Sequence, residues 1–213
     1  MEELKKMKRE ELIDLALDKN STKEKRDEII HFLIEKNDSW ALSELAEYCE
    51  DTEIMKYLAE IDNESIRTGL ACNEKISEEL LVQLSLDARN WVQYYVAQNP
   101  KTPTELSLSL YTKLTQCNDV EVRQNMAEDR LPKKIYGLLA KDEDEQVRIS
   151  VAENDRTPKD VLVSMANDKS DDVRYSLLEN PHTPNEVKKR LDQDNGVKEV
   201  QGKEIEKILR IFK

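Results

Sequence analysis

One phrase recurs along this chain of 213 residues, and its recurrence constrains the fold more than any other feature. VAENDRTPKDVL at 151–162 is matched by VAQNPKTPTELS at 96–107 and by LLENPHTPNEVK at 177–188. A Thr before a Pro is typical of a helix start, because the Thr hydroxyl can accept a hydrogen bond from a free backbone N–H and Pro needs no partner at the first helical position. Each Thr-Pro therefore predicts that one helix ends and another begins.

The phrase belongs to longer units of similar length. The apolar residues that open the units are 26, 26, 30, 25 and 26 residues apart, and they are Trp40, Ile66, Val92, Val122, Val147 and Val173. Steps of this size are typical of a stacked array. Apolar side chains at three- and four-residue spacing indicate two short helices in each unit. The fourth unit is one residue short, so Ile135 takes the place that Leu106 and Val161 take in neighbouring units.

We expect an all-α fold, an α-solenoid (superhelix) of about six two-helix repeats with helical caps. Two short helices cannot bury their apolar stripes alone, so each pair must stack on its neighbours and the ends need caps. The expected parts are an N-terminal helical cap at 1–37, one continuous repeat array at 38–195 and a C-terminal capping helix at 196–213. A capping box from Ser21 to Glu24 predicts the second helix of the first cap. The closing face of the last helix would consist of Ile205, Ile208, Leu209 and Phe212.

The units share the pattern VRxxVAxNPxTPxEVLxxLAxD, which resembles the repeat of leucine-rich repeat variant proteins. The resemblance is close at 92–110 and 147–195, looser at 66–86 and 122–140, and weakest at 40–60. It implies a right-handed superhelix of paired short helices, similar in style to HEAT repeats, and it implies no common activity. Some members hold an iron–sulfur centre in an N-terminal cysteine cluster. Since the first cysteine here is Cys49, we expect no such cofactor.

Composition narrows the classes of partner. The formal net charge is −12, so the chain as a whole repels phosphate backbones, and we do not expect it to bind nucleic acid.

No apolar run is long enough to cross a bilayer, and the charged N-terminus does not fit a signal peptide. The odd cysteine count, without metal-ligand spacing, fits thiols in a reducing compartment and no bound metal: Cys49, Cys72 and Cys117. We expect a cytoplasmic monomer without cofactor.

Four arginines share the second position of their units: Arg67, Arg123, Arg148 and Arg174. Stacking would align them along one side, where they could bind anions or a partner protein. Ala41 and Gln93 break the column in the other two units. Recurrence along the repeats favours the alternative that the arginines form salt bridges between repeats, to acidic residues just before each opening position such as Glu121, Asp144 and Asp172. We keep all four arginines as candidate partner contacts.

A second column consists of Asn73, Asn99, Asn154 and Asn180, where the first helix of a unit must end. Asn accepts the left-handed conformation and bonds to nearby backbone, so we predict a turn role rather than a binding role. Acidic clusters recur before the next helix, at 50–53, 142–145, 168–172 and 192–195. Carboxylates at a helix N-terminus stabilise it, and the spacing at 192–203 does not fit a calcium loop.

Catalytic motifs are missing from the sequence. His31 and His182 lie far apart in it, and no phosphate-binding Gly-rich loop, nucleophile elbow or metal-spaced pair occurs. We therefore expect a chain that is not an enzyme. Aromatic residues gather at Trp40, Trp91, Tyr94 and Tyr95, where filling of the core is the first interpretation and a binding role the second.

We expect a protein–protein interaction scaffold or adaptor of the helical-repeat type. Two alternatives stay open: a nucleic-acid-binding protein or DNA glycosylase of the AlkD type, which needs a basic face, and a cofactor-handling HEAT protein of the phycobilisome type. The long step from Val92 to Val122 indicates an insertion between Tyr111 and Glu121, either in the second helix or as a loop. Insertions in repeat arrays are often at binding edges, so Tyr94, Tyr95 and Tyr111 join the candidate partner contacts. Neutral insertion is the alternative.

Overall fold

The computed structural model describes residues 2–193, and it is all-α over that range. The chain divides into two compact units, residues 1–114 and 115–213, which are described separately below. The predicted face at Ile205, Ile208, Leu209 and Phe212, and the capping helix at 196–213, lie outside the described residues.

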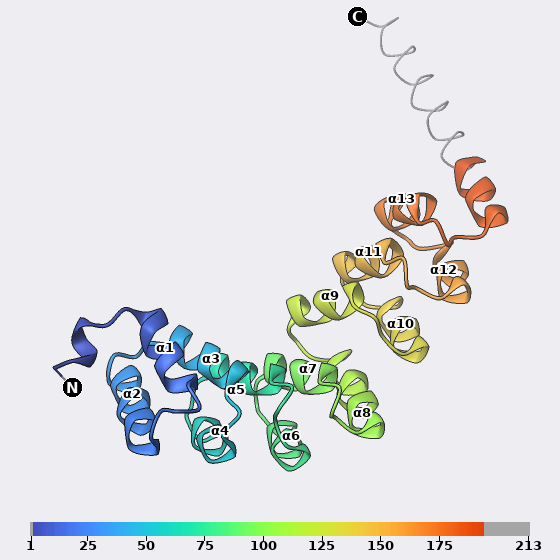
Figure 1. Ribbon diagram of the computed structural model, residues 1–213. Helices are drawn as coiled ribbons and strands as arrows, with labels where there is room; N and C mark the ends of the chain where they lie inside the picture. The colour runs from blue at the N-terminus through green and yellow to red at the C-terminus, as the bar shows by residue number, and fades with distance from the viewer. Residues whose placement is uncertain (1, 194–213) are drawn as a thin grey trace, which may run out of the picture. The chain divides into compact units, whose positions relative to one another are not determined.

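The first unit consists of four helix pairs after one short turn. Its helices are η1 Leu4–Lys6, α1 Arg9–Leu17, α2 Lys23–Glu35, α3 Ser39–Tyr48, α4 Thr52–Ala59, α5 Glu64–Cys72, α6 Glu78–Leu84, α7 Asn90–Gln98 and α8 Thr104–Leu114. Helices α1, α3, α5 and α7 pack side by side in one layer (Figure 1). Each of α4 and α6 packs on the odd-numbered helices before and after it, so the core lies between two layers.

The second unit repeats the same arrangement. Its helices are α9 Val120–Glu128, α10 Lys133–Leu139, α11 Glu145–Glu153, α12 Lys159–Met165 and α13 Asp171–Glu179, and residues 185–193 are also helical. Helix α11 packs between α9 and α13, while α10 contacts α9 and α11, and α12 contacts α13 (Figure 1). Packing of each helix on the next and on the next but one is the arrangement of a helical-repeat solenoid, which confirms the predicted fold class.

In the first helix of the first repeat, the register differs by one residue from the sequence prediction. Trp40 is 54% exposed, and Ala41 is the fully buried residue that opens α3. Ala46, five residues after Ala41, accepts a hydrogen bond from Asn73 of the next pair. Ala71, five residues after Ile66, accepts the equivalent bond from Asn99. Trp40 was therefore the wrong starting residue, because a large apolar side chain attracted the alignment away from a small buried one.

The Thr-Pro phrase works differently from the prediction. Thr102 and Thr157 donate their hydroxyl hydrogens to the carbonyls of Val96 and Val151, at 2.5 and 2.6 Å, so each Thr caps the end of the preceding helix. Pro158 itself occupies the N-cap position of α12. The expectation that Thr caps the following helix was wrong, because a buried hydroxyl is closest to the carbonyls that α11 leaves unpaired.

The N-terminal cap contains the same device. Ser21 donates to the carbonyl of Leu15, six residues back, at 2.6 Å, as the two threonines do. Thr22 is the N-cap of α2 and accepts from the Lys25 N–H, so the predicted capping box from Ser21 was wrong by one residue. Helices α1 and α2 thus form a further pair of the repeat type.

Candidate functional site

The arginine column is buried in ion pairs. Arg67, Arg123 and Arg148 donate from Nε to the carboxylates of Asp87, Asp142 and Asp168, at 2.5, 2.7 and 2.8 Å. Each aspartate lies 19 or 20 residues further along the chain, in the turn before the next odd-numbered helix. The predicted salt bridging between repeats is confirmed for these three arginines, with partners other than Glu121, Asp144 and Asp172. Asp144, for example, caps α11 by accepting from the Gln146 N–H.

Each column residue also bonds to its own pair. Arginine Nη1 atoms donate to the carbonyl six residues earlier, from Arg67 to Ile61, from Arg123 to Cys117, from Arg148 to Asp142 and from Arg174 to Asp168. Gln93 Nε2 does the same to the Asp87 carbonyl. Asp142 and Asp168 therefore accept one arginine at the carboxylate and the next at the backbone, which links α9, α11 and α13 in one ladder.

The ladder sets the protonation of its members. The hydrogen bond that Arg123 donates to Asp142 raises the pKa of Arg123, and the one that Arg148 donates to Asp168 raises the pKa of Arg148. Burial alone would raise the pKa of Asp168, but hydrogen bonds from Arg148 and the Ser170 N–H outweigh it, so this pKa is lowered. Charges held in this way leave little arginine surface for an anion.

The asparagine column joins neighbouring pairs as well as ending helices. Asn154 Nδ2 donates to the carbonyls of Ala127 and Asp129, both at 2.8 Å, and its Oδ1 accepts from the Arg156 N–H. The same bonds recur at Asn73, Asn99 and Asn180. Their turn role is confirmed. The expected left-handed conformation is wrong, since all four have extended ψ angles near 120° and φ angles near −65°.

The aromatic candidates separate into two places. Trp91, Tyr94 and Tyr95 form a ring cluster on α7, with the two tyrosine centroids 5.1 Å apart. Tyr94 and Tyr111 are buried, and Tyr95 is half-buried. Trp40 lies outside this cluster, with the Arg9 guanidinium 5.1 Å from its ring centroid. A partner-binding role for Tyr94, Tyr95, Tyr111 and the arginines stays a prediction, and the proposals below rest on other residues.

The insertion is one extra helical turn. Helix α8 has 11 residues and α6 and α12 have 7 each, so the difference of four matches the longer step. The added turn ends in Leu114, which is fully buried. Residues 115–118 after it line a polar cavity of about 310 Å³ beside Arg123 and Asp142. Arg123 donates a hydrogen bond to the Cys117 carbonyl. Deleting residues 115–118 would remove this bond and destabilise the fold.

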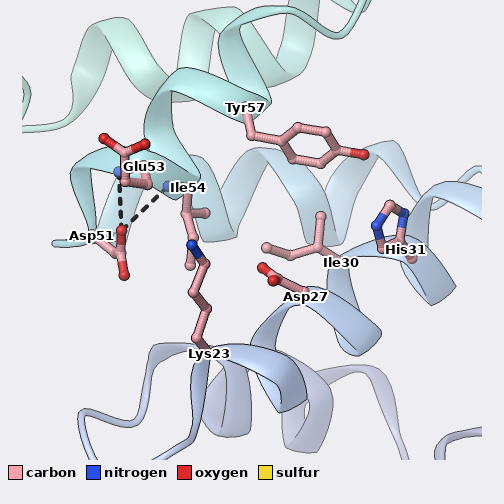
Figure 2. A pocket seen from close by; sticks show the side chains of 8 residues that line it. All are labelled: Lys23, Asp27, Ile30, His31, Asp51, Glu53, Ile54 and Tyr57. Carbon is pink, nitrogen blue, oxygen red and sulfur yellow. Dashed lines mark hydrogen bonds between the residues drawn. The ribbon is translucent and has the colours of Figure 1, made fainter.

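A second cavity, of about 390 Å³, lies between α2 and α4 in the first unit. We call it the α2–α4 groove. It is lined by Lys23, Asp27, Ile30, His31, Asp51, Glu53, Ile54 and Tyr57. The buried side chains of Ile30 and Ile54 form its floor. Figure 2 shows Tyr57 reaching from α4 towards His31 of α2, and the ring centroids are 5.9 Å apart in an edge contact.

The charged side chains of the α2–α4 groove differ in how far the fold uses them. Asp51 caps α4, accepting from the N–H groups of Glu53 and Ile54 at 3.0 and 3.3 Å. It also lies 3.4 Å from the Arg26 guanidinium. Glu53 pairs with Lys56 on the solvent side at 3.0 Å. Asp27 is half-buried between these groups (Figure 2), and no hydrogen bond or ion pair of its side chain occurs within residues 2–193.

None of these groove residues was a sequence candidate. Ala41 and Ile66, which open α3 and α5, are 25 residues apart, whereas Asp51 and Ser77, the N-caps of α4 and α6, are 26 residues apart. Tyr57 lies six residues after its N-cap and therefore corresponds to Gln83 of α6 and Ser164 of α12. An aromatic residue at a position that is polar in these other pairs is the signal that would have identified Tyr57.

The three cysteines are buried or half-buried thiols. Burial raises the pKa of the Cys72 thiol to about 11, with the Glu47 carboxylate adding to the effect, and burial also raises the pKa values of Cys49 and Cys117. All three thiols are free.

Among residues 2–193, no three His, Cys, Asp or Glu side chains are grouped to hold a metal ion, and no helix there combines the length and apolar character of a membrane span.

Comparison of the chain with protein-family models, with curated proteins and with solved structures finds no match.

Proposed function

We propose that this chain is a protein-binding scaffold or adaptor of the helical-repeat type, and that the α2–α4 groove is a principal contact site. The observation that carries the proposal is the groove itself, which combines an apolar floor with an exposed aromatic side chain and a half-buried acidic side chain. Tyr57 is 43% exposed there, and Asp27 has no partner within the described residues. Aromatic residues in such hollows are typical anchors of protein interfaces.

Charge supports a protein partner over a nucleic acid. The formal net charge is −12, and binding of a phosphate backbone would need a basic patch. Arg67, Arg123 and Arg148 do not supply one, because their guanidinium groups are buried against aspartates. A glycosylase of the helical-repeat type would need such a patch beside its carboxylates.

A binding role is also better supported than a catalytic one. His31 is the imidazole among the general bases that the α2–α4 groove offers beside its carboxylates. A working base of this kind is held in position by a hydrogen bond to a third group. Within residues 2–193, His31 makes its ring contact with Tyr57 and no hydrogen bond to a carboxylate. His182 lies in the second unit, in the turn after Asn180.

We further propose that the chain belongs to the leucine-rich repeat variant proteins. This proposal is supported by the shared Thr-Pro phrase and by the backbone hydrogen bonds that residues of the phrase make in the structure. The Asn and Thr of the phrase bond to backbone at the same places in the α7–α8 and α11–α12 pairs, as Asn99 with Thr102 and Asn154 with Thr157 show. The cysteine cluster of some members has no counterpart before Cys49.

The proposed function is tested by affinity capture with the full chain as bait, using cell extract and quantitative mass spectrometry. The groove variant is Tyr57→Ala, and the matched control is Tyr175→Ala, which removes a 60% exposed tyrosine from α13. We expect at least one protein to be retained by the original chain and by Tyr175→Ala and lost from Tyr57→Ala. Equal retention by all three baits, or retention by none, would contradict the proposal.

A further inference from the structure

The α2–α4 groove contains an acidic group at a place where a cation would have several partners. Asp27 projects from α2 between Lys23 and Ile30, below Tyr57 of α4 (Figure 2). Its neighbours Asp51 and Glu53 already accept hydrogen bonds from backbone N–H groups or from Lys56. Asp27 is therefore the carboxylate with free capacity to accept from a ligand.

The shape and chemistry of the α2–α4 groove favour a long cationic side chain. The methylene stem of an arginine or lysine could lie on Ile30 and Ile54, while its charged end meets Asp27 and the face of Tyr57. One lysine and three acidic residues line the groove, so its formal charge is 1 − 3 = −2. The charge of the whole chain adds a long-range attraction for basic partners.

We infer that the α2–α4 groove binds an arginine or lysine side chain presented by a basic segment of a partner protein. The inference rests on the proposed function and names the chemistry of the partner. Lys23 is the one groove residue that opposes it, because its ammonium group carries the same charge as the ligand. Removing the Asp27 charge should therefore weaken binding, and removing the Lys23 charge should strengthen it.

The test uses the full chain and a defined probe. The probe is an acetylated and amidated octapeptide of alternating arginine and glycine. Its control carries citrulline in place of arginine, which keeps the shape and removes the charge. Binding is followed by amide chemical shifts in NMR spectra at physiological salt. We expect the largest shift changes in residues 27–31 and 53–57, with the citrulline peptide producing none.

Three variants distinguish a site from general attraction to an acidic protein. Asp27→Asn should weaken binding of the arginine peptide at least fivefold, and Lys23→Gln should strengthen it about twofold or more. Glu78→Gln on α6 makes the same charge change outside the groove and should have no effect. Equal losses in Asp27→Asn and Glu78→Gln, or shift changes spread over the acidic turns, would overturn the inference.

The two proposals fail in different ways. If a captured protein depends on Tyr57 and the arginine peptide does not bind at Asp27, the inference about basic segments is wrong and the binding function stands. If the arginine peptide binds at Asp27 and no captured protein depends on Tyr57, the cation site stands and the adaptor function is wrong.

Discussion

At the scale of single residues, the structure is held together by polar side chains that replace missing backbone partners between helix pairs. Asn154 is the clearest example, because it donates hydrogen bonds to two carbonyls at the C-terminal end of α9 and accepts one from an N–H in its own turn. A helix end leaves such carbonyls unpaired, and a buried unpaired group costs about 1–3 kcal/mol. Stacking of the pairs therefore depends on specific hydrogen bonds as well as on apolar contact.

Replacing Asn154 by Ala should lower the free energy of unfolding by about 1–3 kcal/mol, since the Ala127 carbonyl loses its donor while the Asp129 carbonyl keeps its hydrogen bond from Tyr136. The matched control is Asn125→Ala, because the Asn125 side chain bonds only within its own helix, to the Glu121 carbonyl. That control should change stability by less than about 0.5 kcal/mol. Urea unfolding of both variants gives the comparison, and similar losses in the two would refute a linking role for Asn154.

The Arg148–Asp168 pair leads to a pH prediction. Asp168 has a lowered pKa in the folded chain, against an ordinary value of about 3.9 when unfolded. The contribution of Asp168 to the free energy of unfolding is therefore present above about pH 4, and it is lost as the pH falls through the pKa of the folded chain. Asp168→Asn keeps the acceptor for Ser170 and removes the charge that Arg148 faces, so at pH 7 it should destabilise by about 3–5 kcal/mol.

The difference in unfolding free energy between the original chain and Asp168→Asn should shrink as the pH falls from 5 to 2. Denaturant titrations across that range measure it. A difference that stays constant with pH would show that the charge of Asp168 is not what stabilises the fold.

At the scale of helices, the spacing between α3 and α5 within their layer depends on a single glycine. A Cβ added at Gly69 of α5 would collide with the backbone carbonyl oxygen of Ser43 in α3, and the Ser43 hydroxyl already donates to the Ser65 carbonyl at 2.8 Å. Gly137 of α10 has open space where a Cβ would be placed. A larger residue therefore does not fit at position 69, whereas position 137 has room for one.

Gly69→Ala should destabilise the fold by about 1–3 kcal/mol through overpacking, and Gly137→Ala should stabilise it by up to about 1 kcal/mol through helix propensity. Thermal unfolding of the two variants is the measurement. A stabilised Gly69→Ala variant would mean that α3 and α5 do not approach as closely as described.

Most helices could be predicted from the sequence, because their apolar spacing and their Asn and Thr-Pro boundaries repeat. The bonding partners could not. Arg148 pairs with Asp168 and not with Asp144, since the choice depends on how the next turn folds over α11. Ala41 was missed because a small buried side chain carries a weaker signal than the adjacent Trp40. Asp27 and Tyr57 come from different pairs, and only the packing of α2 near α4 places them around one cavity.

At the scale of the whole molecule, the repeat forms the framework, and we propose the α2–α4 groove as the binding surface. The ladder of arginines and aspartates uses the charges that first suggested an anion site, so these residues stabilise the framework. Side chains that vary between pairs, such as Tyr57 against Gln83 and Ser164, are left to determine what is bound.

Hydrogen–deuterium exchange of the full chain, with and without a captured partner protein, tests this account most directly, because it reports on every helix without assuming a site. We predict slower amide exchange on binding in residues 23–31 and 51–57, around the α2–α4 groove. Unchanged exchange in both segments, with protection confined to other helices such as α8 or α11, would contradict it.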